Sequence, residues 1–78
     1  MDDFYEKIKR YPNNVTPRQL VELLESYGFV YRKTSGDHEI YKRLGYRPFP
    51  VPIKQNPVWI KIVKNALQII AEIRESQE

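Results

Sequence analysis

Prolines at every second position, Pro48, Pro50 and Pro52, constrain the fold of this chain more than any other feature. Proline has no backbone N–H, so a strand through this segment lacks every second donor of its hydrogen-bond ladder. Such a strand belongs at the edge of a sheet. The residues between and after the prolines are apolar, and they are Phe49, Val51 and Ile53. We therefore predict an edge strand over 47–53 with one apolar face.

Two further strands are predicted upstream of this segment. Residues 29–34 are β-branched, aromatic and basic, which is typical of a half-buried strand. The sequence Ser35-Gly36-Asp37 predicts a tight turn, after which residues 38–43 return as a second strand with Ile40 and Tyr41 on opposite faces. Leu44-Gly45 then allows another reversal toward the proline-rich strand.

Helix signals flank the strands. Thr16, Pro17 and Gln19 form a capping-box pattern that predicts a helix over 17–27, and Gly28 provides its C-terminal cap. A similar pattern, Asp3 followed by Glu6, predicts a short helix over 3–11.

The last helix is predicted to begin with Asn56 as N-cap and Pro57 as first residue, and to run to about Arg74. Its apolar face is broad, because it includes Val58, Ile60 and Ile69 in addition to a regular stripe that begins at Trp59. Deep burial of this helix would account for the breadth of its apolar face. The alternative is that a partner protein binds the additional apolar residues.

A chain of 78 residues is too short for two cores, so we expect one domain over 1–78, with the short helix at 3–11 and the core within 16–75. The order helix, helix, strand, strand, strand, helix predicts an α+β protein with a three-stranded antiparallel sheet and helices on one face. Apart from the short first helix, this order is the one found in double-stranded-RNA-binding domains.

Basic charge is concentrated in the middle of the chain. Residues 32–64 hold eight of the 13 Lys and Arg residues but only two of the ten Asp and Glu residues, a net charge of +6. Such a stripe attracts phosphate or an acidic protein. Charged residues of this kind also serve simply as solvated surface, and charge alone does not choose between these interpretations.

Few kinds of catalytic site are compatible with one histidine and no cysteine. A disulfide framework, a thiolate or paired-histidine metal site and a serine triad are excluded, and the scattered glycines form no phosphate-binding loop. We therefore expect no metal or other cofactor. The remaining candidate is His38, which follows the Gly36 turn and is expected beside Lys33, Lys42 and Tyr41. Imidazole exchanges protons near neutral pH, although an exposed hairpin histidine can also have no role.

Several segments together resemble one protein family. They are the run from Leu20 to Phe29, the turn and strand from Ser35 to Tyr41, and Val51-Pro52-Ile53 followed by a final helix. This combination, over roughly residues 13–72, is similar to the HicA toxins, which have a helix ending in Gly-Phe, a Gly-Ser-His turn, a Val-Pro strand and a closing helix. Asp37 departs from the pattern, because the family usually has Ser or another small residue there.

The resemblance implies a double-stranded-RNA-binding-like fold and a function as the toxin of a type II toxin–antitoxin system. It further implies ribosome-independent cleavage of messenger RNA, neutralisation by a HicB-type antitoxin, and a catalytic role for His38. A consistent hypothesis is metal-free cleavage in which His38 removes the proton of a ribose 2′-hydroxyl. Tyr41 or a lysine would then protonate the leaving oxygen. The candidate phosphate-binding residues are Arg32, Lys33, Lys42, Arg43, Arg47 and Lys54.

Two alternatives without catalysis remain. The same fold and charge suit an RNA-binding module that recognises shape and phosphate alone. They also suit a protein-interaction module that meets an acidic partner. The acidic N-terminus has no apolar signal region and no apolar run reaches the length of a membrane helix, so a soluble cytoplasmic protein is expected, with no membrane partner.

Overall fold

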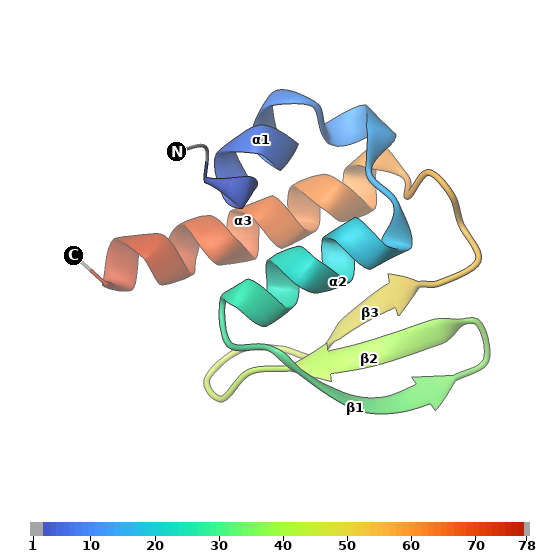
Figure 1. The fold of residues 1–78 in the computed structure, drawn as a ribbon. Coiled ribbons are helices and arrows are strands. Elements are labelled where there is room, and N and C mark those ends of the chain that lie inside the picture. Colours follow the sequence, from blue (N-terminus) through green and yellow to red (C-terminus); the bar gives the residue numbers. More distant parts are fainter. Residues whose placement is uncertain (1–2, 78) are drawn as a thin grey trace.

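The sheet and the helices form two layers in the computed structural model, which describes residues 3–77 (Figure 1). The elements in chain order are α1 (Phe4–Arg10), a short 3-10 turn η1 (Pro12–Asn14), α2 (Pro17–Ser26), β1 (Val30–Ser35), β2 (His38–Lys42), β3 (Phe49–Pro52) and α3 (Ile60–Ser76). The strands pair antiparallel in the order β1-β2-β3. The predicted α+β class, with a three-stranded antiparallel sheet, is confirmed for the described residues.

The start of α2 forms as its sequence predicts. The Thr16 hydroxyl accepts a hydrogen bond from the Gln19 backbone N–H at 3.1 Å, and the Gln19 side chain accepts one from the Thr16 N–H at 2.9 Å. This reciprocal capping satisfies two N–H groups that the first helical turn leaves unpaired. Gly28 has φ +87°, a conformation that strains residues with a Cβ, and it lets the chain turn from α2 into β1.

The core lies between α2, α3 and the inner face of the sheet. Its side chains are almost entirely excluded from water and come from both helices, from the sheet and, with Phe29, from the connection between α2 and β1: Leu20, Leu23, Leu24, Phe29, Tyr41, Phe49, Val51, Val63, Ala66, Ile70 and Ile73. In β3 the apolar residues Phe49 and Val51 point into this core while Pro50 is exposed. The predicted edge strand is thus confirmed, shortened to Phe49–Pro52.

The predicted start of the last helix at Pro57 is wrong, because α3 begins at Ile60. Val58 is buried, and its backbone N–H donates to the carbonyl of Val15 at 2.8 Å, so this residue belongs to a connection with the N-terminal part of the chain. Trp59 occupies the N-cap position, and its backbone N–H donates a hydrogen bond to Oε1 of Gln55 at 2.6 Å. A long-range hydrogen bond therefore overrides a local helix-start signal.

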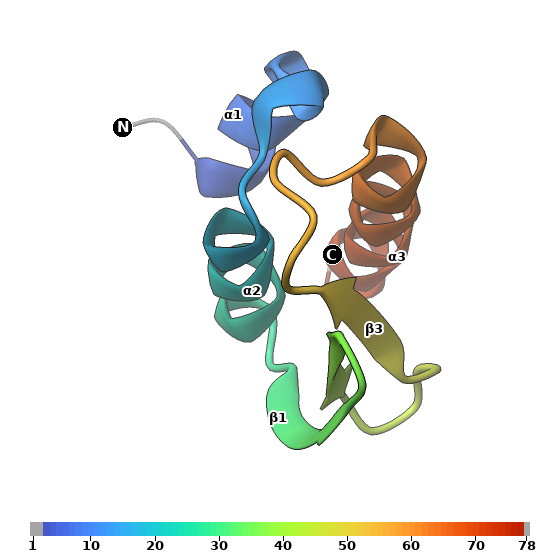
Figure 2. The same cartoon turned by 90° about the vertical axis from the view of Figure 1, so that its right-hand side faces the viewer.

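The prediction that the first strand is half-buried is also wrong. Every residue of β1 is exposed, because β1 is the edge strand on the far side of the sheet from α3 (Figure 2). In both views α2 and α3 lie on one side of the sheet, and no described helix covers its other face. One sheet face is therefore open to solvent.

Candidate nucleic-acid interface

Strand β2 divides its side chains between the two faces of the sheet. Tyr41 is only 5% exposed and belongs to the core, so it and Glu39 point toward the helices. Because side chains alternate along a strand, His38, Ile40 and Lys42 form a row on the opposite, open face. The structure thus places the single histidine of the chain and one predicted phosphate-binding lysine on one accessible surface.

A bulge in β1 brings two more cations to this row. Tyr31 pairs with Tyr41 and Lys33 pairs with Ile40, which leaves Arg32 as the extra residue. Two neighbouring residues then stand opposite one, and both reach the same side of the sheet. The basic side chains meet in an open depression of about 360 Å³, lined by Arg32, Lys33, Ile40, Lys42 and Pro48. We call this depression the basic site.

His38 lies in a second depression, of about 550 Å³, which we call the histidine site. Its lining comes from the β1–β2 turn, the end of β3 and the segment that leads into α3: Asp37, His38, Pro52, Lys54, Gln55, Trp59 and Ile62. The turn positions the imidazole because Gly36 adopts φ +57° and His38 is the next strand's first residue, paired with Ser35. The His38 side chain is exposed and accessible to a ligand.

An ion pair forms one wall of the histidine site. Nζ of Lys54 lies 3.3 Å from Oδ1 of Asp37, and the Asp37 carbonyl accepts a hydrogen bond from the Ile53 N–H at 3.0 Å. Both charged side chains are more than 60% exposed, so the pair adds at most about 1 kcal/mol to stability. Its main effect is local, because Lys54 offsets the negative charge that Asp37 places beside His38.

The two sites share no lining residue, and the register of β1 and β2 relates them. Lys33 is opposite Ile40 and is therefore the diagonal neighbour of His38 across the β1–β2 pair, at a spacing of roughly 7–8 Å that a lysine side chain spans. Lys42 lies four residues beyond His38 on β2, about 13 Å away along the strand. The strand register thus places Lys33 nearer to His38 than Lys42, and both lysines line the basic site.

Tyr41 is on the wrong face to act with His38. Its hydroxyl donates to Oε1 of Glu39 at 3.1 Å, within the part-buried inner face of the sheet. Burial, together with the hydrogen bond to Glu39, raises the pKa of Tyr41 to about 12. The structure therefore does not bring the predicted proton donor to the histidine, and Lys54 is the lysine that lines the histidine site.

Arg43 supports the fold through contacts that the sequence did not predict. Its guanidinium donates to the carbonyl of Tyr27, at the C-terminus of α2, at 2.5 Å and lies 5.5 Å from the centre of the Tyr46 ring. A cation at this end of a helix satisfies a free carbonyl and favours the helix dipole. Arg43 is thus held by the protein and lines neither the basic site nor the histidine site.

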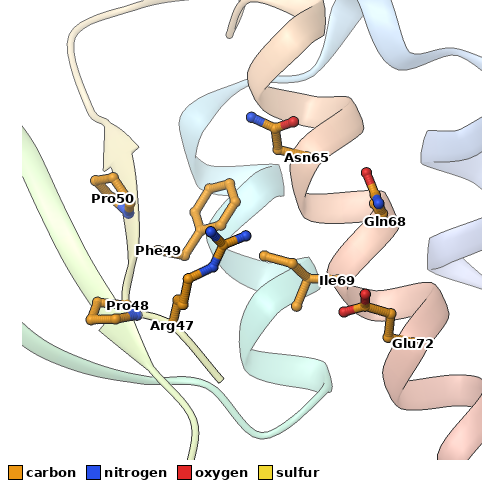
Figure 3. Close-up of a pocket in the computed structure, with 8 residues that line it drawn as sticks. All are labelled: Arg47, Pro48, Phe49, Pro50, Asn65, Gln68, Ile69 and Glu72. Atoms are coloured by element: carbon orange, nitrogen blue, oxygen red, sulfur yellow. The ribbon is translucent and has the colours of Figure 1, made fainter. Parts of the chain in front are cut away.

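Arg47 is also apart from both sites. It lines a third cavity, of about 340 Å³, between β3 and α3. Figure 3 shows its side chain extending toward Ile69 of α3, with Glu72 on the next helical turn. Of the six predicted phosphate-binding residues, the structure therefore gathers Arg32, Lys33 and Lys42 in one site and Lys54 in the other.

Sequence reasoning missed Trp59 as a site residue. Its spacing from Ile62 and Val63 matches an apolar helix face, but the side chain is 67% exposed and lines the histidine site. No local signal identified it, because Asn56-Pro57 predicts a helix start that would place Trp59 within the helix.

Residues 3–77 contain no group of three or more His, Cys, Asp or Glu side chains arranged to hold a metal ion. None of the described helices has both the length and the apolar character needed to span a bilayer. Comparisons of the chain with models of known families, with curated proteins and with solved structures found no match.

Proposed function

We propose that this protein is an endoribonuclease of the HicA toxin type, with a double-stranded-RNA-binding-like fold, that uses His38 to cleave messenger RNA. One observation carries the proposal. The only histidine of the chain is exposed at the start of β2, and Arg32, Lys33 and Lys42 gather in a separate depression along the same two strands. An accessible imidazole and a cluster of cations on the same pair of strands are the two components that metal-free RNA cleavage requires, a proton acceptor and phosphate-binding charge.

In the proposed reaction, His38 accepts the proton of a ribose 2′-hydroxyl, and the 2′-oxygen attacks the adjacent phosphorus. The bond from phosphorus to the 5′-oxygen breaks as that oxygen takes up a proton. The products are a 2′,3′-cyclic phosphate and a free 5′-hydroxyl. Lys54 lines the same site and, as an ammonium group, supplies the proton or stabilises the negative charge that develops on the phosphate.

The basic site holds the RNA strand in this scheme. Its three cations contact phosphates on one side of the cleaved bond, and Lys33, the diagonal neighbour of His38 across the β1–β2 pair, contacts the phosphate nearest to that bond. Phosphate contacts of this type position the strand and contribute affinity that falls with rising salt concentration. The ion pair with Lys54 reduces the repulsion that Asp37 would otherwise exert on phosphate.

A cleavage assay tests the proposal. Purified protein is incubated with single-stranded RNA and a metal chelator, alongside His38→Gln and, as a surface control, Lys64→Gln on the exposed side of α3. We expect wild type and Lys64→Gln to cut RNA to 2′,3′-cyclic phosphate ends, and His38→Gln to lose at least about 100-fold in rate. A substrate with 2′-deoxyribose at the cleavage position should resist. Equal cutting of the deoxy substrate, or full activity of His38→Gln, would refute the mechanism.

A second candidate is an RNA-binding module without catalysis. The absence of a second imidazole and the position of Tyr41 on the inner face favour this alternative. It predicts salt-dependent RNA binding that depends on Lys33, together with no cutting by the wild-type protein. The same basic face is complementary to an acidic HicB-type antitoxin, and co-purification with the product of an adjacent reading frame would test that partner.

A further inference from the structure

Trp59 is a large apolar side chain left in solvent at a place where the backbone is firmly held. The residue before it, Val58, is buried, and its backbone N–H donates a hydrogen bond to the Val15 carbonyl. The backbone N–H of Trp59 donates to the side chain of Gln55. The Trp59 carbonyl accepts from Ile62 and Val63 at 2.9 and 3.1 Å. Nevertheless, 67% of the residue's surface is accessible. The backbone at Trp59 is therefore held at a defined position, and its indole is not used for core packing.

The surroundings of Trp59 combine the polar groups and the apolar surface that a nucleotide site needs. It shares one depression with His38, Lys54 and Gln55, which supply an imidazole, a cation and an amide. The other residues that line the depression are Asp37, Pro52 and Ile62. The volume, about 550 Å³, lies within the range of small-molecule sites. An aromatic face beside a phosphate-binding cation is the combination by which proteins hold single-stranded nucleic acid, because every base has a face that stacks.

We propose that Trp59 is a stacking platform for one base of single-stranded RNA, next to the phosphate that His38 acts on. This inference rests on the proposed function and extends it to a substrate class. In a duplex, both faces of each base are already stacked on neighbours, so a base reaches Trp59 only from an unpaired region. Trp59 thereby selects unpaired RNA and fixes the register of the strand relative to His38.

Trp59 is the only tryptophan of the chain, so its fluorescence reports this position alone. The His38→Gln protein is titrated with an unstructured single-stranded oligoribonucleotide and with the same sequence as a duplex, so that binding is measured without cleavage. We expect the single strand to change the emission of Trp59 and to bind more tightly than the duplex. Fluorescently labelled RNA then allows variants that lack the indole to be compared by anisotropy.

In the His38→Gln background, Trp59→Ala should weaken single-strand binding by about 5- to 100-fold, and Trp59→Phe, which keeps an aromatic face, should weaken it less. Tyr11→Ala is the matched control, because Tyr11 is an aromatic residue with 64% exposure that lies outside both sites. Thermal unfolding of each variant verifies that the fold is retained. The Tyr11 variant should bind as the parent does.

Three results would overturn the inference, and they separate it from the proposed function. If Trp59→Ala binds RNA as tightly as the parent while the wild type cuts RNA through His38, only the stacking role is wrong. If neither the wild type nor His38→Gln binds RNA, both proposals fall. If RNA leaves the emission of Trp59 unchanged while Trp59→Ala converts a sedimenting dimer to a monomer, the exposed indole is a protein contact instead.

Discussion

Replacing Arg43 separates a structural cation from one that binds RNA. Arg43→Met keeps an unbranched apolar stem but removes the hydrogen bond to the Tyr27 carbonyl and the contact with the Tyr46 ring. A hydrogen bond from a charged donor contributes about 1.5–3 kcal/mol, and a partly exposed cation–π contact about 0.5–1 kcal/mol. Since methionine regains part of the packing, we expect the free energy of unfolding to fall by about 2 kcal/mol.

Urea denaturation of the wild type, Arg43→Met and Arg43→Lys measures this loss. A change of about 2 kcal/mol lowers the melting temperature of a domain of this size by roughly 8–16 °C. RNA affinity, measured per folded molecule at a temperature where all three proteins are folded, should stay within about twofold of wild type. The reasoning is refuted if the free energy of unfolding of Arg43→Met lies within about 0.5 kcal/mol of the wild-type value while its RNA affinity falls as far as that of Lys33→Gln.

Other residues support three shorter predictions. The hydrogen bond with Arg74 lowers the pKa of Asp3 in the folded protein below 3.8, the value of an unpaired aspartate. The stability that this hydrogen bond adds is therefore fully present above pH 3.8 and is lost as the pH falls through the lower pKa of the folded state. Asp3→Asn should therefore be less stable than wild type at pH 7 and nearly equal to it at pH 2, as followed by thermal unfolding; a constant difference would contradict this. Thr16→Ala should cost about 1 kcal/mol in urea denaturation, through loss of the capping box, and an unchanged midpoint would argue against that role. Lys33→Gln should weaken RNA binding uniformly across sequences and reduce the salt slope by about 1, whereas Lys64→Gln should change neither.

The elements of this fold with local signals were predicted well. The capping box at Thr16 and the glycine at position 28 delimit α2, because both act on backbone groups within one turn of the helix. The prolines at alternate positions identified β3 as an edge strand for the same reason, since a missing N–H is a property of the residue itself.

Elements that depend on distant partners were predicted less well. Asn56-Pro57 satisfies the rules for a helix start, yet α3 begins at Ile60, because Val58 is bound to Val15 in another part of the chain. Hydrophobic spacing placed Trp59 in the core, but the shifted helix start leaves it exposed. A local sequence pattern does not show which distant backbone group will form a hydrogen bond with one of its residues.

The candidate site shows the same division. The chain alone was enough to single out His38 and to place it after a glycine turn, because only neighbouring residues are involved. Which cations accompany it depended on the bulge at Arg32, on the face taken by Tyr41 and on a contact between Arg43 and Tyr27, 16 residues apart. The sequence does not show what each lysine or arginine binds, because a positive charge does not specify its partner. Tertiary contacts decided which of them support the fold, as Arg43 does, and which line an open depression, as Arg32 and Lys33 do.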